Sequence, residues 1–131
     1  HIFWLTMLPT HDNDEHERLN KLIYELAGRD QRISVIDLTP LFADENGNYL
    51  EGIERSGKYW PIRKIDGVHL CRFGSRIATE LVIEHVSIFA GFEVVSGWED
   101  GEWLTNSRFD LDPCSDPVDL IAGKAELLSI G

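Results

Sequence analysis

Asp66 and His69 stand three positions apart in the run Asp66-Gly67-Val68-His69-Leu70, and their side chains could act together in catalysis. A histidine that acts as a general base needs one ring nitrogen held by an acceptor while the other faces the nucleophile. Gly67 loosens the turn, so the carboxylate can fold back onto the imidazole and stabilise the imidazolium formed during proton transfer. The pair therefore predicts general-base catalysis, which typically contributes about 10²–10⁴ in rate.

The same spacing also has a purely structural interpretation. The chain holds eleven aspartates and five histidines, and a random chain of this composition contains an Asp-x-x-His about one time in three. Under this interpretation Asp66 starts a helix, and His69 is half-buried and bonded to the backbone. The residues around the pair decide between the two interpretations.

Residues 65–78, with a glycine at Gly74, resemble the final motif block of the SGNH (GDSL) hydrolase superfamily, where an Asp-Gly-Val-His-Leu run precedes a closing amphipathic helix. The resemblance covers residues 1 to about 90 and reaches loosely into the tail. It implies a serine esterase or O-acyltransferase in which Asp66 orients His69 and His69 activates the serine. The other similar features, in order, are a strand that ends at Pro9, a helix with Arg18 and Asn20, and a strand at residues 35–38.

The tail is similar to the C-terminal extension of SGNH domains fused to bacterial cell-surface sugar acyltransferases. This resemblance implies a carboxylic ester substrate, an O-acetyl group on a carbohydrate, and an extracytoplasmic location. It implies no cofactor and no metal. The residues that carry it are Gly97, Trp98, Gly101, Glu102, Trp103, Arg108, Phe109, Pro113, Cys114 and Asp116.

The nucleophile of the superfamily lies in a Gly-Asp-Ser block that this sequence lacks, as it lacks the Gly and Asn blocks of the oxyanion hole. Ser34 and Ser87 sit inside predicted elements, which is the wrong setting for a nucleophile on a sharp exposed turn. We therefore expect this chain to be a C-terminal half that is inactive without the missing N-terminal half of the same domain. The alternative is a non-catalytic pseudoenzyme, or a carbohydrate-binding or interaction module, that retains the fold.

Two β-type runs flank an amphipathic helix in the first part of the chain. Residues 2–8 form a continuous apolar run, typical of a strand buried on both faces, and residues 33–38 form a second strand. Apolar residues at helical spacing between residues 19 and 26 predict a helix that is capped by residues 12–14 and ended by Gly28. Strand, helix and strand predict a parallel sheet, part of a three-layer α/β/α sandwich of the flavodoxin-like kind, with the catalytic loops at the carboxyl ends of its strands.

The second part is predicted to begin with a loop over residues 44–59 and irregular chain over residues 61–67. A helix over residues 72–89 and a short strand at residues 92–95 follow. We expect residues 1–90 to be half of the SGNH-like domain and residues 91–131 to be an extension packed on it. Trp98, Trp103 and Phe109 would form the core of that extension.

Cys71 and Cys114 can make at most one disulfide, which is too few for a disulfide scaffold. Both could equally be reduced, buried thiols, and we expect them to be unpaired. Cys71 replaces the Thr or Ser common in the family after His-Leu. We interpret it as a helix-cap substitute, the alternative being a thiol nucleophile.

Other motifs are predicted to be structural. Gly52 and Gly57-Lys58 imitate a phosphate loop, but Tyr59 stands where Ser or Thr must bind magnesium. The Asp44-x-Asn46-x-Asn48 run lacks the glycine and glutamate of a calcium loop and predicts a turn. The remaining candidate metal ligands are interpreted as solvated groups, namely His11, Asp12, Asp14, Glu15 and His16 in one cluster and Asp110, Asp112, Asp116 and Asp119 in another. His85 is expected on the exposed flank of a helix. Trp98 and Trp103 could stack on a sugar, but we interpret them as packed core residues of the tail.

The composition excludes some partners. A formal net charge of −11 with only 12 Lys and Arg argues against nucleic acid and against anionic membrane surfaces. The longest apolar region, residues 81–95, is interrupted by Glu84 and His85, so no membrane segment is expected in this chain. The partners that remain are an ester or acylated carbohydrate substrate and the missing half of the domain.

Overall fold

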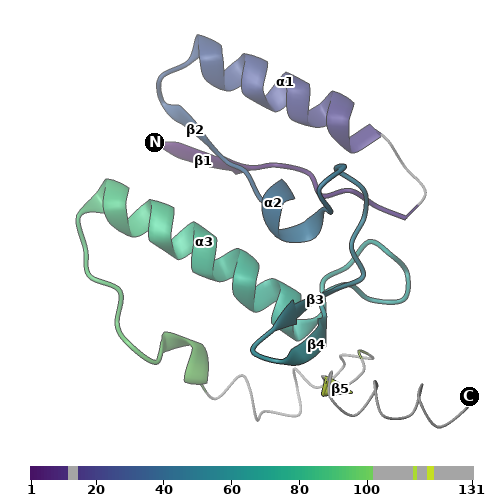
Figure 1. Cartoon of the computed structure of the whole chain (residues 1–131). Coiled ribbons are helices and arrows are strands. Elements are labelled where there is room, and N and C mark those ends of the chain that lie inside the picture. Colours follow the sequence, from purple (N-terminus) through teal and green to yellow (C-terminus); the bar gives the residue numbers. More distant parts are fainter. Residues whose placement is uncertain (12–14, 102–113, 115–117, 120–131) are drawn as a thin grey trace, which may run out of the picture.

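The computed structural model describes residues 1–11, 15–101, 114 and 118–119, and Figure 1 shows the course of the chain. The helix cap predicted at residues 12–14 lies outside the described residues. So do Trp103, Phe109 and the acidic positions 110, 112 and 116. The predicted extension over residues 91–131 is therefore described only in part.

The chain begins with a strand, a helix and a second strand: β1 (Ile2–Leu5), α1 (Glu15–Arg29) and β2 (Ile33–Ile36). β1 and β2 are parallel, with Ile2 opposite Ile33 and Leu5 opposite Ile36. α1 and α3 (Arg72–Ala90) both contact β2 and lie on opposite sides of the strand pair (Figure 1). The predicted α/β class with a parallel sheet is confirmed, and the sheet has two strands among the described residues.

β1 is shorter and far more exposed than its sequence predicts. It ends at Leu5 rather than Leu8, and Ile2 and Trp4 are 54% and 41% exposed. Burial on both faces was therefore the wrong prediction, because in the described part of the chain β1 pairs only with β2. The predicted apolar stripe of α1 is likewise buried only at Ile23. Gly28 lies inside the last turn of α1 rather than after it.

Polar side chains fix the segment that follows β1. Thr6 is buried, and its hydroxyl donates to the Asp37 carboxylate at 3.1 Å and accepts from the Leu38 amide at 2.9 Å. The side chain of Asn20 on α1 accepts from the Met7 amide and donates to the Met7 carbonyl, at 2.6 and 2.8 Å. These contacts hold the carboxyl ends of both strands and α1 together.

The hydrophobic core lies between β2 and α3 rather than around β1. It consists of side chains from β2, from α2 (Thr39–Phe42), from the chain before the candidate site and from α3, namely Ile36, Leu38, Phe42, Ile62 and Ile77. α2 is one turn long and begins at Thr39, with Pro40 in its first turn, where a proline is tolerated. The core therefore joins β2 to α3 directly.

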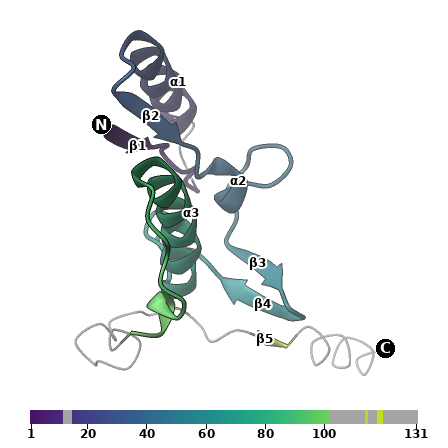
Figure 2. The same cartoon turned by 90° about the vertical axis from the view of Figure 1, so that its left-hand side faces the viewer.

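A β-hairpin replaces the second half of the predicted loop. β3 (Gly52–Arg55) and β4 (Lys58–Pro61) are antiparallel, and β5 (Val118–Asp119) pairs with β4. Figure 2 shows this small sheet below the parallel strands. The two-residue turn has positive φ at Ser56 and Gly57, 54° and 75°, which is the arrangement that two-residue hairpins favour. The strand predicted at residues 92–95 is absent, and a 3₁₀ turn, η1 (Trp98–Asp100), follows that segment.

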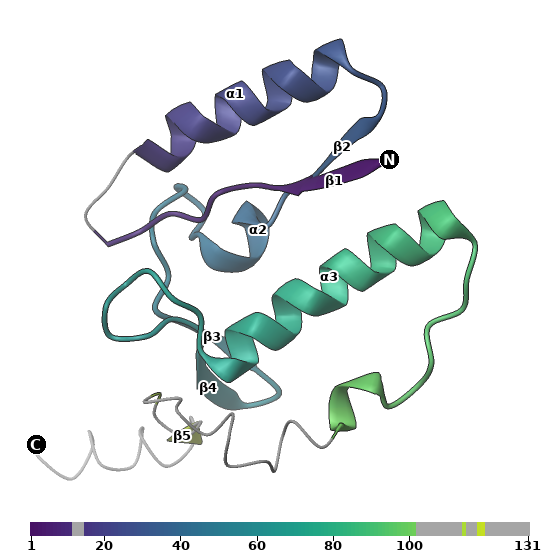
Figure 3. The same ribbon diagram turned by 180° about the vertical axis from the view of Figure 1, so that it is seen from behind.

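The long helix α3 agrees with the prediction and packs tightly at its start. It begins after Cys71 and ends at Gly91, which is left-handed with φ 70° (Figure 3 shows its full length). A Cβ atom added at Gly74 would lie 2.2 Å from the Ile62 carbonyl oxygen. Only a glycine lets the first turn of α3 approach the backbone of Ile62, which opens the segment that carries Asp66 and His69.

We predict that Gly74→Ala lowers the free energy of unfolding of the full-length protein by about 1–3 kcal/mol, as overpacking of a tight contact does. Gly28→Ala is the matched control, because Gly28 is also helical and has no atom within 4 Å of the added Cβ. It is expected to raise stability by up to about 1 kcal/mol. Urea denaturation of both variants measures this, and equal stability of the two would contradict the close approach.

Candidate active site

Asp66 and His69 lie in a turn that its own backbone closes. The Cys71 amide donates to the Ile62 carbonyl at 2.9 Å, and the Lys64 amide donates to the His69 carbonyl at 2.8 Å. Inside this frame the Gly67 amide donates to the Lys64 carbonyl, and Gly67 has φ +68°, a conformation that side-chain-bearing residues rarely adopt. The ten residues 62–71 thus form one compact turn.

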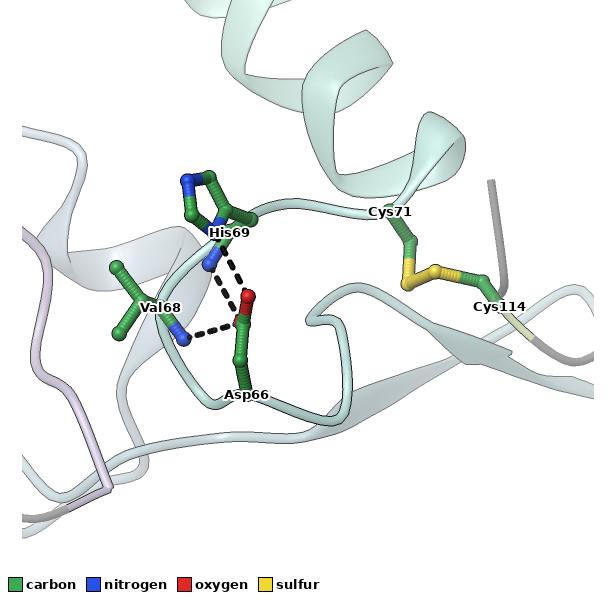
Figure 4. Close-up of a disulfide and its surroundings, with 5 residues drawn as sticks. All are labelled: Asp66, Val68, His69, Cys71 and Cys114. Carbon is green, nitrogen blue, oxygen red and sulfur yellow. Dashed lines mark hydrogen bonds and ion pairs between the residues drawn. A yellow bond between two sulfur atoms is a disulfide. The ribbon is translucent and has the colours of Figure 1, made fainter. Parts of the chain in front are cut away.

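The carboxylate of Asp66 folds back onto His69, as the spacing predicts. One oxygen, Oδ2, lies 2.7 Å from Nδ1 of the imidazole. The other, Oδ1, accepts from the backbone amides of Val68 and His69 at 2.9 and 3.0 Å. Figure 4 shows these contacts and the second ring nitrogen, Nε2, which points away from Asp66. The arrangement leaves one nitrogen held and the other available.

Both side chains of the pair are open to solvent: that of His69 is 73% exposed and that of Asp66 47%. The hydrogen bond from His69, together with those from the two amides, holds the pKa of the Asp66 carboxyl well below its usual range. Asp66 is therefore ionised at neutral pH and can accept a hydrogen bond from the Nδ1–H group of His69. Nε2 is then left as an exposed acceptor.

The turn lies against the segment that follows β1. A Cβ atom at Gly67 would be 2.7 Å from the Cβ of His11. Arg63, at the start of the turn, donates from Nη2 to the Pro9 carbonyl and to the Gly67 carbonyl, the latter at 3.4 Å. These contacts bring the pair to the carboxyl end of β1, the end of a parallel sheet where functional groups ordinarily gather.

The two cysteines form a disulfide, which corrects the expectation that they are unpaired. Cys71 and Cys114 are joined with 5.9 Å between their Cα atoms, across 43 residues of sequence. Cys71 occupies the N-cap of α3 but makes no side-chain capping hydrogen bond. The alternative of a thiol nucleophile is wrong, because both sulfurs are bonded. The disulfide instead ties the chain two residues after His69 to the C-terminal extension (Figure 4).

Among the described residues, no serine forms a hydrogen bond with the His69 side chain, which bonds to Asp66. Ser34 lies near the amino end of β2 and bonds to the His1 ring at 2.8 Å, at the opposite end of the strands. Ser75 and Ser87 are in α3, Ser56 is in the hairpin turn, and Ser96 follows α3. Ser107, Ser115 and Ser129 lie outside the described residues.

The other sequence motifs have structural places. The Gly52–Lys58 stretch lies in the β3–β4 hairpin, without the helix N-terminus that binds phosphate. Asp44 accepts from the amides of Asn46 and Asn48, both at 2.8 Å, which confirms the predicted turn. His85 is exposed on α3, as predicted, and its Nδ1 bonds to the Leu81 carbonyl.

Metal-binding clusters and membrane-spanning helices can also be examined in the described part of the chain. In the described ranges no three His, Cys, Asp or Glu side chains gather as a metal site requires. None of the helices that the structure describes has the length and apolar character to cross a membrane. Trp98 is half-buried in η1, whereas Trp103 lies outside the described part.

Sequence reasoning missed Arg63. It is only 3% exposed, and its guanidinium lies 5.3 Å from the centre of the Tyr49 ring and 5.9 Å from that of Phe42. The sequence feature that could have indicated it is the position of Arg63 directly after the apolar residues Pro61 and Ile62, just before the Asp66 turn.

The fold and this pair define an α/β protein with an exposed carboxylate–imidazole pair at the carboxyl end of a parallel strand. The chain belongs to the family described as "Protein of unknown function (DUF459)", whose model matches residues 1–85. The matched region extends from β1 into α3 and includes both Asp66 and His69. No curated protein and no solved structure matches the chain.

We predict that the side-chain carboxyl carbon NMR signal of Asp66 shifts in an acid titration only well below pH ~4, the ordinary Asp range. The pKa of Asp66 is depressed, so its contribution to the turn is present above that range and is lost as pH falls through the folded-state pKa. The Asp66→Asn variant should lack this transition. A midpoint near pH ~4 would show that the carboxylate is not held by these donors.

We also predict that replacing Cys71 and Cys114 with serine lowers the free energy of unfolding by about 4 kcal/mol, given the 43-residue separation. Urea denaturation with and without a dithiol reductant measures the effect. The reductant should destabilise the wild type and leave the double variant unchanged. Alkylation of free thiols in the native, unreduced protein would contradict the pairing.

Proposed function

We propose that Asp66 and His69 are the orienting carboxylate and the general base of a serine esterase or O-acyltransferase, whose serine is supplied by polypeptide outside this sequence. The observation that carries the proposal is the 2.7 Å contact between Asp66 Oδ2 and His69 Nδ1, combined with an exposed Nε2. A general base requires this division of roles between its two ring nitrogens.

The proposed reaction follows from the division of roles. Nε2 of His69 accepts the serine proton while the serine oxygen attacks the ester carbonyl, and Asp66 stabilises the imidazolium that results. The imidazolium then returns this proton to the leaving alcohol, and an acyl-enzyme remains. In the second half, water or a sugar hydroxyl gives its proton to Nε2 and attacks the acyl carbonyl, and the imidazolium returns this proton to the serine oxygen as the acyl–serine bond breaks.

The proposed substrate class is an O-acetyl ester on a carbohydrate. The resemblance of the tail, through Trp98, Trp103 and Arg108, to extensions of sugar acyltransferases supports the carbohydrate. The net charge of −11 supports a neutral ligand over a phosphate polymer. The cell-surface location belongs to the same proposal.

The nucleophile is assigned to a separate segment because the sequence contains no Gly-Asp-Ser block. The described serines also lie in helices, strands or turns, and none of them forms a hydrogen bond with His69. Exposed apolar side chains on β1, such as Ile2 and Trp4, support the docking of further polypeptide at this sheet. A non-catalytic binding module is the competing outcome of the test below.

In the full-length protein, His69→Ala is expected to lower turnover of p-nitrophenyl acetate by about 10²–10⁴, because the serine loses its base. Asp66→Asn is expected to lower turnover as well, because the amide no longer holds the working tautomer of His69. A steady-state assay, paired with labelling by a serine-reactive fluorophosphonate, measures both effects.

His85→Ala is the matched control, since His85 is also exposed and also hydrogen-bonded through Nδ1, but to the Leu81 carbonyl of α3. Its turnover should equal that of the wild type. Unchanged turnover in His69→Ala would refute the proposed base. A wild type that neither turns over the ester nor reacts with the fluorophosphonate would favour the binding module.

A further inference from the structure

Arg63 is a buried cation directly beneath the Asp66–His69 turn. Its Nη2 donates to two carbonyls, those of Pro9 and Gly67. The guanidinium also lies over the rings of Tyr49 and Phe42. The side chain is thus enclosed by the segment after β1, by residues 42–49 and by its own turn, and it does not reach the exposed face where His69 presents Nε2.

The burial of Arg63 is costly. Its Nε and Nη1 atoms are buried without a hydrogen-bond partner among the described residues. Burial lowers the pKa of the guanidinium, and the nearby Tyr49 and Asp66 oppose that effect. An apolar side chain of similar length would fill such a site without leaving two donors unsatisfied. Stability alone therefore does not account for an arginine here.

The two carbonyls that Arg63 joins belong to different parts of the fold. Pro9 follows β1, at the carboxyl end of the parallel strands, and lies 54 residues from Arg63 in sequence. Gly67 lies between Asp66 and His69. The hydrogen bonds that shape the turn are made within residues 62–71, and the amides of Ile62 and Arg63 donate to the Glu51 carbonyl before β3. None of these backbone bonds joins the turn to the segment after β1. Arg63 supplies a direct polar link between the two.

We propose that Arg63 is a positioning residue that holds the His69 turn at the correct distance from the carboxyl end of β1. The inference rests on the proposed function, because that distance matters for catalysis only if His69 must meet a nucleophile carried at this edge of the sheet. Misplacement of a catalytic group by about 1 Å can cost ~10²-fold in rate. Arg63 acts through the turn and contacts no reacting atom.

The test compares Arg63→Met, which keeps the length but removes the donors, with Arg63→Lys, which keeps one charged donor group. In the full-length protein, Arg63→Met is expected to lower kcat for p-nitrophenyl acetate by about 10- to 100-fold, with KM within about twofold of the wild type. Arg63→Lys should recover part of the loss. The melting temperature of Arg63→Met should stay within a few degrees of the wild-type value.

Arg55→Met is the matched control. Arg55 also lies over an aromatic ring, that of Phe73 at 5.8 Å, and it pairs with Glu80 rather than with the turn. Its kcat should be unchanged. A wild-type kcat in Arg63→Met would overturn the inference. So would a loss of kcat that accompanies a large drop in melting temperature in both Arg63 variants, because that result describes a structural residue.

An NMR measurement decides the inference even if the wild type proves inactive and the proposed function fails. In Arg63→Met the proton–proton NMR contacts between His11 and Gly67 should weaken. The proton signal of His69 Nδ1 should still show the hydrogen bond to Asp66. Retention of the His11–Gly67 contacts would overturn the inference. Loss of the Nδ1 signal would also overturn it, because Arg63 would then shape the pair rather than position it.

Discussion

A single carboxylate with three donors is the interaction on which the candidate site depends. Asp66 accepts from the imidazole of His69 and from two backbone amides, and those amides are available only because the chain turns tightly at Gly67. A carboxylate with this many donors stays ionised, and an ionised carboxylate keeps the imidazole in one orientation. The chemistry of His69 therefore depends on the backbone conformation of its neighbours as much as on its own side chain.

The surroundings of the turn transmit this constraint to the rest of the fold. Gly74 lets α3 start directly against Ile62, and Cys71 joins the same helix start to the C-terminal extension. Ile62 and Ile77 belong to the core that also contains Ile36 of β2. The exposed Asp66–His69 pair is thus attached to the hydrophobic core through Ile62, whereas β1 and much of α1 remain exposed to solvent.

Local patterns predicted those features that depend on neighbours in sequence. Short stretches of sequence predicted the helical spacing of apolar residues in α3, the parallel pairing of β1 with β2 and the contact between Asp66 and His69. The burial of β1 could not be predicted, because it depends on what lies beside the strand. The hairpin was missed because positive φ at Ser56 is uncommon for a residue with a side chain. The disulfide and the role of Arg63 depend on contacts across 43 and 54 residues.

The closed turn has a consequence for the order in which the protein acquires its shape. The contacts that define the Asp66–His69 pair are made inside residues 62–71, and a loop of this length closes in ~10–100 ns. The link from Arg63 to Pro9 spans 54 residues of sequence, so its closure is slower than that of the turn. The hydrogen bond between His69 and Asp66 can therefore form early during folding, and the position of the pair relative to β1 is fixed later.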